Sequence, residues 1–150
     1  MNIRKAHVTD IKLIHKMVNE FARKEEMLPR ALNELYEGIR DFVLCEDEGE
    51  IRGVCALRIV WEDLAEIRSL AVQDRYQRRG IGTKLLKHCL KEAKGLGIQR
   101  VFALTYQPEF FTKAGFREIE KAKLPQKIWG DCMKCPKFPE CNEHAVILDL

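Results

Sequence analysis

The sequence has no long apolar segment. None of its 150 residues belongs to a run approaching the roughly 20 apolar residues of a membrane-spanning helix. The first residues, 1–5, lack the apolar stretch of a secretory signal peptide. Internal repeats, low-complexity tracts and linker-like stretches are absent too. We therefore expect one domain over residues 1–150, in the cytoplasm and without a membrane partner.

The sequence also has little net charge. Lys and Arg total 26 against 23 Asp and Glu, which gives a formal net charge of +3. A nucleic-acid-binding protein usually carries a stronger excess of positive charge and a groove-reading element, so we expect no nucleic-acid partner. One local group of cations suits either a small polyanion or a solvated basic surface. It comprises Arg75, Arg78, Arg79, Lys84 and Lys87.

Residues 66–97 indicate a strand, a tight loop and a helix. After the strand Glu66–Val72, apolar residues recur at three- and four-residue steps as far as Gly95 and Gly97, as in a helix with one buried face. These residues are Ile81, Leu85, Leu86, Cys89, Leu90 and Ala93. At the helix start, Gly80 and Gly82 leave the backbone accessible, and unpaired N–H groups together with the helix dipole favour an anion. The loop is therefore predicted to bind phosphate.

Spacing excludes two common phosphate-binding motifs. A Walker loop requires Gly-Lys-Ser/Thr, but here Gly82 is followed by Thr83 and then Lys84, with no earlier Gly at the required distance. A dinucleotide fingerprint requires a third Gly three residues after the second, where this sequence has Leu85. The loop must therefore serve another phosphate ligand.

The loop resembles the Gln/Arg-x-x-Gly-x-Gly/Ala motif of the GNAT superfamily of N-acetyltransferases. Gln77, Gly80 and Gly82 match this motif, and Leu70–Val72 resembles the strand end that precedes it. Phe110–Phe116 is similar to the second signature of the superfamily, usually Phe-Tyr-x-Lys-x-Gly-Phe. The two signatures occur in the right order and spacing, so together they indicate the family more strongly than either does alone.

The resemblance and the order of the predicted elements imply an α/β (α+β) fold, with a mixed central sheet of splayed parallel strands flanked by helices. Further helices are predicted from Thr9 or Asp10 onward, over residues 27–40 and from Pro108. Strands are predicted over residues 2–6, 42–45, 51–60, 66–72, 100–105, 116–120 and 145–150.

The resemblance also implies acetyl-CoA as co-substrate. In GNAT enzymes the pantetheine arm lies between the splayed strands and pairs with main-chain groups, as an added strand would. This implies that Leu70, Ala71 and Val72 contact pantetheine and that an oxyanion-stabilising amide lies near Val72. The pyrophosphate is expected on the loop residues Gln77, Arg78, Arg79, Gly80, Ile81, Gly82 and Thr83.

Glu66 is the candidate catalytic base. In several GNAT branches a Glu at this place in the central strand deprotonates the amine directly or through water, and only an unprotonated amine is a nucleophile. Regular alternation would put the side chains of Glu66, Arg68, Leu70 and Val72 on one face of the strand. A structural pair between Glu66 and Arg68 is the alternative.

The sequence leaves the general acid open. Many GNAT enzymes have Tyr at the position of Phe111, and a Phe cannot donate a proton to the departing thiolate. Tyr106, at the end of the preceding predicted strand, is one substitute, although a packing role is the favoured interpretation for it. Direct release of the thiolate is the other alternative.

The C-terminal part of the sequence indicates a particular group within the superfamily. Leu124–Trp129 and Asp131–Cys141, with Glu66–Val72, resemble the short, stand-alone bacterial N-acetylglutamate synthases, which are amino-acid N-acetyltransferases. This implies acetyl transfer to the α-amino group of L-glutamate, the first step of arginine biosynthesis. Glutamine as the acceptor, and a homodimer as the assembly, stay open.

A dicarboxylic amino acid requires cationic and hydroxyl donors. Arg68 lies near the expected chemistry and Lys127 near the C-terminal motif, so both are candidates for the substrate carboxylates. Ser69 offers a hydroxyl group. For Lys127, an exposed loop lysine without a ligand is an equal alternative.

The six cysteines fall into two groups. Cys45, Cys55 and Cys89 lie in apolar strand or helix patterns and are interpreted as core residues. The others occur in a Cys-x2-Cys-x5-Cys-x2-His pattern, interpreted first as free thiols in a loop without a metal and second as a tetrahedral zinc site. A disulfide is disfavoured in a reducing compartment. The pattern consists of Cys132, Cys135, Cys141 and His144.

Two other functions stay open. One keeps acetyl transfer but changes the acceptor to another small amine or a protein N-terminus. The other is a non-catalytic acyl-CoA-binding module whose cysteine-containing loop docks a partner or senses redox state. Glu66 argues for catalysis, whereas Phe111 keeps the non-catalytic alternative open.

Overall fold

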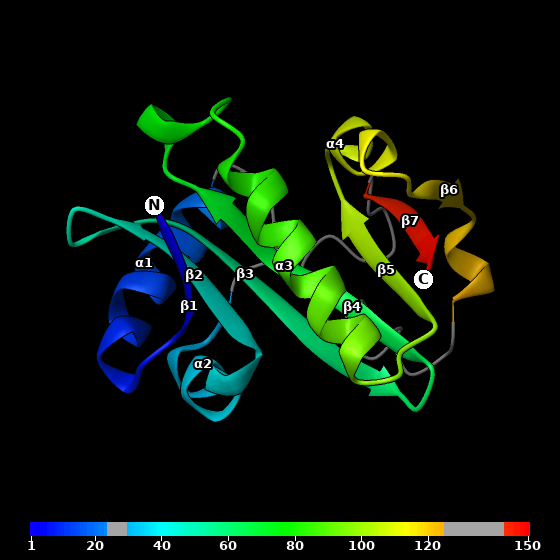
Figure 1. Ribbon diagram of the computed structural model, residues 1–150, viewed down its shortest axis with the longest axis horizontal. Helices are drawn as coiled ribbons and strands as arrows, with labels where there is room; N and C mark the ends of the chain where they lie inside the picture. The colour runs from blue at the N-terminus through cyan, green and yellow to red at the C-terminus, as the bar shows by residue number, and fades with distance from the viewer. Residues whose placement is uncertain (24–29, 125–142) are drawn as a thin grey trace.

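In the computed structural model, which describes residues 1–23, 30–124 and 143–150, the described strands form one mixed seven-stranded sheet (Figure 1). Their order across the sheet is β1-β2-β3-β4-β5-β7-β6, and every pair is antiparallel except β4 with β5. This confirms the predicted mixed sheet. The strands are β1 (Asn2–Lys5), β2 (Phe42–Asp47), β3 (Glu50–Trp61), β4 (Leu64–Val72), β5 (Arg100–Thr105), β6 (Arg117–Ile119) and β7 (His144–Asp149).

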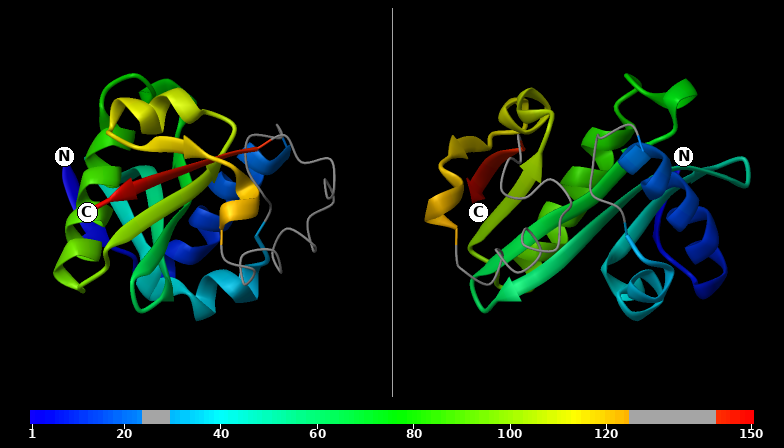
Figure 2. Two further views of the ribbon diagram at one scale, coloured as in Figure 1. Left: turned by 90° about the vertical axis from the view of Figure 1, so that its right-hand side faces the viewer. Right: turned by 180° about the vertical axis from the view of Figure 1, so that it is seen from behind.

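Helices cover both faces of the sheet. Helix α3 crosses the face toward the viewer in Figure 1, whereas α1 and α2 are seen against the opposite face in Figure 2. The longer described helices are α1 (Ile11–Arg23), α2 (Leu32–Glu37), α3 (Ile81–Gly95) and α4 (Pro108–Lys113). Single 3-10 turns are formed by Val8–Asp10, Ile39–Asp41, Asp74–Tyr76 and Lys121–Lys123. None of the described helices has both the length and the hydropathy needed to cross a bilayer.

Each covered face has its own hydrophobic core. The apolar stripe of α3 packs on Cys55, Leu57 and Ile67 of the sheet. On the other face, the buried side chains of α1 and α2 pack on β2, β3 and Ala71 of β4. The two cores hold β4 between α3 on one side and α1 with α2 on the other.

The second predicted helix is shorter than expected. The prediction was a helix over residues 27–40, but α2 spans Leu32–Glu37; residues 24–29 lie outside the described part. Arg30 is not helical, because its backbone N–H and C=O are bonded to the side chain of Asn19. After Gly38, the chain tightens into a 3-10 turn.

The parallel strands β4 and β5 separate, as predicted. They pair only from Leu64–Arg100 to Glu66–Phe102. Beyond that point β4 continues to Val72 and β5 to Thr105 without pairing to each other. One edge of β4 is therefore open over its second half.

A bulge at Ser69 interrupts the alternation of side chains along β4. Ser69 has a φ of 53°. In the pairing with β3, Arg68 lies opposite Ala56 and Ala71 opposite Val54, so β4 contains one extra residue. The expected common face is therefore wrong: Arg68 faces the α1–α2 side with Ala56, whereas Leu70 and Val72 pack with the core beneath α3. The reason is that an inserted residue reverses the side-chain alternation of everything after it.

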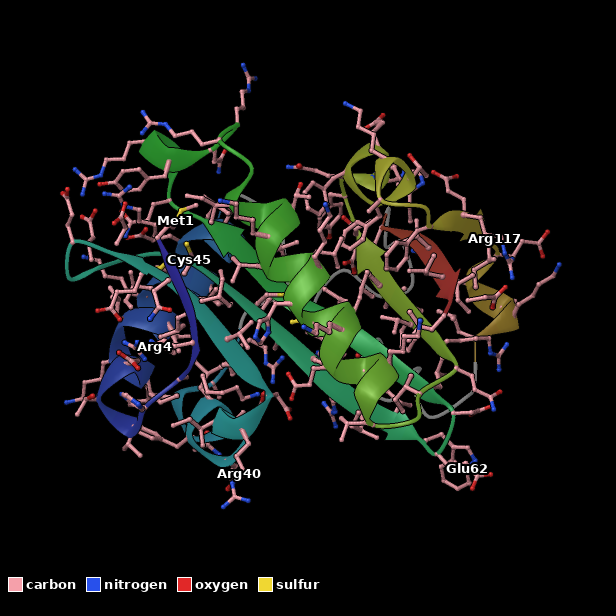
Figure 3. The ribbon with its side chains drawn as sticks, in the orientation of Figure 1. Met1, Arg4, Arg40, Cys45, Glu62 and Arg117 are labelled. Carbon is pink, nitrogen blue, oxygen red and sulfur yellow. The ribbon has the colours of Figure 1, made fainter. Side chains whose placement is uncertain are left out.

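Ion pairs connect the two outer edges of the sheet to their neighbours (Figure 3). At one edge, Arg4 of β1 donates hydrogen bonds to Asp10, at 2.9 and 3.2 Å, and to Glu46 of β2. Asp10 also accepts a bond of 2.7 Å from the His7 N–H, so it ties β1 to the turn before α1. At the other edge, Arg117 is 3.7 Å from Asp149 in a pair whose side chains are 62% and 65% exposed.

Candidate functional site

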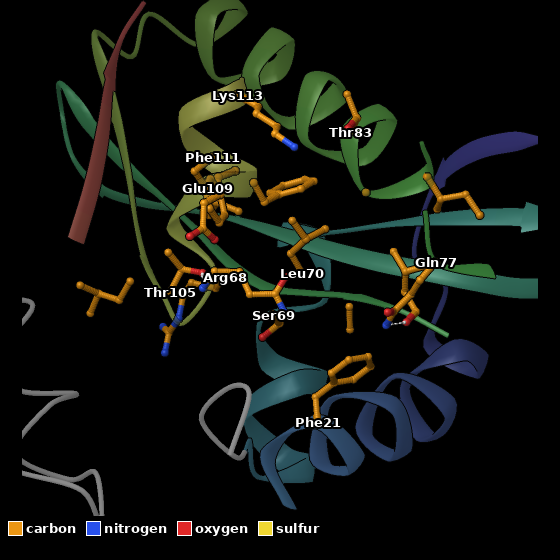
Figure 4. Close-up of a pocket in the computed structure, with 18 of the residues that line it drawn as sticks. Phe21, Arg68, Ser69, Leu70, Gln77, Thr83, Thr105, Glu109, Phe111 and Lys113 are labelled. Atoms are coloured by element: carbon orange, nitrogen blue, oxygen red, sulfur yellow. Dashed lines mark hydrogen bonds between the residues drawn. The ribbon is translucent and has the colours of Figure 1, made fainter. Parts of the chain in front are cut away.

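A groove with a volume of about 740 Å³ lies where β4 and β5 separate. Its walls come from β4, the following loop, the start of α3, the end of β5 and α4. Figure 4 shows Phe21 of α1 on one side of β4, and Thr83 of α3 with Lys113 of α4 on the other. The groove therefore reaches both faces of the sheet.

Most of the predicted site residues meet at this groove. The lining includes Glu66, Arg68 and Ser69, the strand end 70–72, and the loop and helix residues Gln77, Arg78, Gly80, Ile81, Gly82 and Thr83. Among the described residues, Arg79 is predicted for the site but does not line the groove. Lys127, Cys132, Cys135 and Cys141 lie outside the described residues. His144 lies on β7, with its Nδ1 3.7 Å from a Glu118 carboxylate oxygen.

The start of α3 presents backbone donors to the groove. Gly80, with a φ of 81°, caps the helix, and the N–H groups of the first turn have no partners within a helix. A Cβ on Gly82 would lie 3.3 Å from the Phe110 ring, so glycine leaves room there that a side chain would fill. Backbone donors, the helix dipole and this space together suit a phosphate group.

Two glutamines fix the loop before α3. Gln73 donates from Nε2 to the carbonyl oxygen of Ile51 at 2.7 Å. Gln77 donates from Nε2 to the carbonyl oxygen of Val72 at 3.0 Å and to Asp74 Oδ1 at 3.3 Å. The Gln of the recognised motif thus ties the loop back to the end of β4, which positions the start of α3 beside the open strand edge.

Three arginines, Arg79 among them, surround the ring of Tyr76. The guanidinium carbons of Arg52, Arg75 and Arg79 lie 4.2, 4.9 and 5.7 Å from the centre of its ring. Its hydroxyl donates to Glu50, which also pairs with Arg75. The Tyr76 hydrogen bond lowers the pKa of Glu50, and the same bond raises the pKa of Tyr76. Arg79 therefore packs on this cluster and does not line the groove.

Glu66 and Arg68 form a shielded ion pair in the groove. Glu66 is 8% exposed, and the two side chains are 3.6 Å apart between Arg68 Nε and Glu66 Oε1. Two charges this far from water each require a partner. Glu66 is also the last β4 residue that pairs with β5, so its side chain stands where the strands begin to separate.

Several lining residues were not predicted for the site from the sequence, among them Phe21, Arg30 and Glu143. The Arg30 side chain is 13% exposed, and its Nε is 3.5 Å from Glu34 Oε2. Glu143 is a second buried carboxylate, immediately before β7. In the sequence, the helical spacing of Phe21 indicated only that its side chain faces the core. For Arg30 and Glu143 no local signal exists, because chain topology brings these distant segments to β4.

The buried carboxyl group of Asp41 lies within electrostatic reach of two arginines of the groove. Burial raises the pKa of its carboxyl group, against the lowering effect of nearby positive charges. Those charges belong to Arg58, Lys5, Arg30 and Arg68. Arg30 and Arg68 of the groove therefore both act on the same carboxyl group, that of Asp41.

Phe111, in the aromatic wall of the groove, has no hydroxyl group that could act as a general acid. This residue is 5% exposed and packs edge to face against Phe110 and Phe116, with each pair of ring centres 5.2 Å apart. Of the described tyrosines, Tyr106 does not line the groove, and Tyr76 does, but its hydroxyl is bonded to Glu50.

The fold and the groove have counterparts among known proteins. Residues 10–116 match the acetyltransferase (GNAT) family. An N-acetyltransferase of Chlorobaculum tepidum, described as uncharacterized, is 38% identical over 99% of this chain and 96% of its own length. An amino-acid acetyltransferase of Mycobacterium tuberculosis is 35% identical over 86% of this chain and 75% of its own length.

The solved structure of N-acetylglutamate synthase from Neisseria gonorrhoeae, complexed with coenzyme A and N-acetyl-glutamate, is similar over 99% of this chain. The TM-score is 0.91 and the sequences are 31% identical. The match covers 35% of that longer chain. The similarity therefore concerns one part of the Neisseria protein.

Proposed function

Because the chain belongs to the acetyltransferase (GNAT) family, we propose that it transfers the acetyl group of acetyl-CoA to the α-amino group of L-glutamate. This reaction would place it at the first step of arginine biosynthesis. The main support is one observation: the open edge of β4, the start of α3 and the Glu66–Arg68 pair border a single groove.

The coenzyme is assigned to the α3 side of the groove. The pyrophosphate would accept hydrogen bonds from the N–H groups of residues 80–83, and Gly82 leaves room for it beside Phe110. The amide-containing pantetheine arm would pair with the open edge of β4 at residues 70–72, since β5 has left that edge unpaired. This arrangement brings the thioester toward the bulge at Ser69.

The chemical step is attack of a neutral amine on the thioester carbonyl carbon. A C–N bond forms, the C–S bond breaks, and coenzyme A leaves as a thiolate while the amine loses a proton. We assign that proton to Glu66, directly or through water, because its carboxylate lies where the strands separate. A backbone N–H near Val72 is assigned to the developing oxyanion.

Thiolate release without a phenolic acid is part of the proposal. Phe111 has no proton to donate, and Tyr106 does not line the groove. A thiol has a pKa of about 8.5, so its conjugate base is a far better leaving group than an amine or alkoxide. The thiolate can then take a proton from water after it has left.

The acceptor is assigned to the α1–α2 side of β4. L-glutamate carries two carboxylates, and two guanidinium groups, those of Arg30 and Arg68, line this side of the groove. Ser69 provides a hydroxyl group between the two sides. Lys127 stays a candidate from the sequence.

A thiol-release assay tests this function directly. Acetyl-CoA is incubated with L-glutamate, L-glutamine, a panel of small amines, a peptide with a free N-terminus, or buffer alone, and products are identified by mass. We expect saturable coenzyme A release with L-glutamate, yielding N-acetylglutamate. Saturation at lower concentration with another amine would change the acceptor. Tight acetyl-CoA binding without release for any acceptor would instead support a non-catalytic module.

A further inference from the structure

Asn19 holds the backbone of Arg30 with two hydrogen bonds and is bonded to α1 by a third. Its Nδ2 donates to the carbonyl oxygen of Arg30 at 3.1 Å, and its Oδ1 accepts from the Arg30 N–H at 3.2 Å. The second Nδ2 hydrogen goes to the carbonyl oxygen of His15, one turn earlier in α1, at 2.8 Å. One side-chain amide thus binds both polar backbone groups of Arg30 and anchors them to α1.

This amide is itself fixed in space. Met17 and Val18, the residues before Asn19, are buried in the core between α1 and the sheet. The bond to His15 removes the remaining freedom of the side chain. The position of Arg30 is therefore set by α1, eleven residues away in sequence.

The fixed backbone directs the Arg30 side chain into the groove. That side chain is 13% exposed, lines the groove and has its Nε 3.5 Å from Glu34 Oε2. A guanidinium group on a mobile backbone would lose conformational entropy each time it bound a carboxylate. The amide bonds from Asn19 remove much of that cost before the ligand arrives.

We propose that Asn19 is a positioning residue for acceptor affinity: it holds Arg30 so that its guanidinium can bind a carboxylate of the acceptor. Asn19 does not itself line the groove, so it acts only through Arg30. The inference rests on the proposed transfer to L-glutamate. It predicts that Asn19 affects the KM for glutamate and has little influence on the coenzyme or on the chemical step.

The test is a double-mutant cycle on the full chain. Asn19→Ala removes all three bonds, and Asn19→Asp keeps the shape but turns the donor nitrogen into an oxygen facing two carbonyl groups. We expect either variant to raise the KM for L-glutamate about 5–30-fold. The kcat and the KM for acetyl-CoA should stay within about twofold of the starting enzyme. Asn33→Ala, an exposed asparagine of α2, is the matched control and should change none of these constants.

The second half of the cycle separates positioning from general destabilisation. In an Arg30→Ala background, Asn19→Ala should have little further effect on the glutamate KM, because the guanidinium that it positions is gone. Hydrogen exchange at the Arg30 amide gives a readout independent of turnover, and should accelerate in Asn19→Ala, which lacks the oxygen that accepts from this N–H.

Each result is decisive for this inference. An unchanged glutamate KM in a folded Asn19→Ala enzyme, or an equal increase with and without Arg30, would overturn it while leaving the transfer reaction intact. A starting enzyme that does not use L-glutamate would overturn the proposed function first, and the positioning role with it.

Discussion

At the scale of single residues, Glu66 lies where the parallel strands β4 and β5 begin to separate. It is the last residue of β4 to pair with β5, and its side chain lies 3.6 Å from Arg68 on the wall of the groove. A carboxylate in a buried structural pair would matter for stability, whereas a catalytic base would matter for turnover. These two roles can be separated by an isosteric change.

We expect Glu66→Gln to lower kcat by about 10²–10⁴-fold, because an amide cannot accept the proton of the amine. The KM for acetyl-CoA should change little, since Glu66 lies on the other side of β4 from the α3 helix start. Steady-state kinetics, with thermal unfolding to verify folding, measure both. Glu62→Gln, at the exposed turn between β3 and β4, is the control. Full turnover in Glu66→Gln would exclude Glu66 from the reaction.

At the scale of secondary structure, the coenzyme site proposed at the start of α3 depends on the lack of a side chain at Gly82. The nearest atoms to a Cβ there would belong to the Phe110 ring, at 3.3 and 3.4 Å, and to Val72, at 3.8 Å. A side chain would either displace Phe110 or project into the space assigned to the coenzyme. The effect on binding should therefore exceed the effect on folding.

We expect Gly82→Val to raise the Kd for coenzyme A by about tenfold or more, since extra methyl groups would overfill the site. The free energy of unfolding should change by no more than about 1 kcal/mol. Isothermal titration with coenzyme A and thermal unfolding provide the two measurements. Gly95→Ala, at the far end of α3 with no atom within 4 Å of the added Cβ, should leave coenzyme affinity unchanged. Equal affinities for Gly82→Val and the starting enzyme would contradict a phosphate site here.

The sequence predicted regular elements well because their signals are local. The apolar spacing in α3 and its flanking glycines marked both ends of that helix, and β5 was predicted with its observed bounds. The position of the bulge was not predicted because Ser69 is not a residue type that signals a positive φ, so the alternation in β4 looked unbroken. Arg30 and Glu143 were missed for another reason: only the folded topology brings them to the groove.

At the scale of the whole molecule, the Arg4–Asp10–Glu46 network connects β1, the turn before α1 and β2. The Arg4 guanidinium holds the pKa of Asp10 below its ordinary value of 3.8. Because the unfolded chain takes up this proton at higher pH than the folded chain, the pair adds stability above about pH 5. That contribution is lost as the pH falls through the lower folded-state pKa of Asp10.

We expect Asp10→Asn to lower the free energy of unfolding at pH 7 by about 1–2 kcal/mol, through loss of the charged bonds to Arg4 and a weaker bond to the His7 N–H. The difference between variant and starting protein should shrink as the pH falls from about 5 toward 3. Urea unfolding at several pH values measures this. Asp149→Asn breaks the exposed pair with Arg117 at the opposite sheet edge and should cost less than about 0.5 kcal/mol. A constant difference across that pH range would refute the assignment to Asp10 ionisation.

The extra residue at Ser69 has a consequence for redesign of the enzyme. Side chains before it, at 66 and 68, face the compartment assigned to the amino acid, whereas those at 70 and 72 face the one assigned to the coenzyme. Acceptor preference can thus be altered by substitutions upstream of the insertion while the cofactor contacts downstream are retained. Deleting that one residue would make residues 68 and 70 direct neighbours, so regular alternation would keep both sets on their present faces while the bulge was lost.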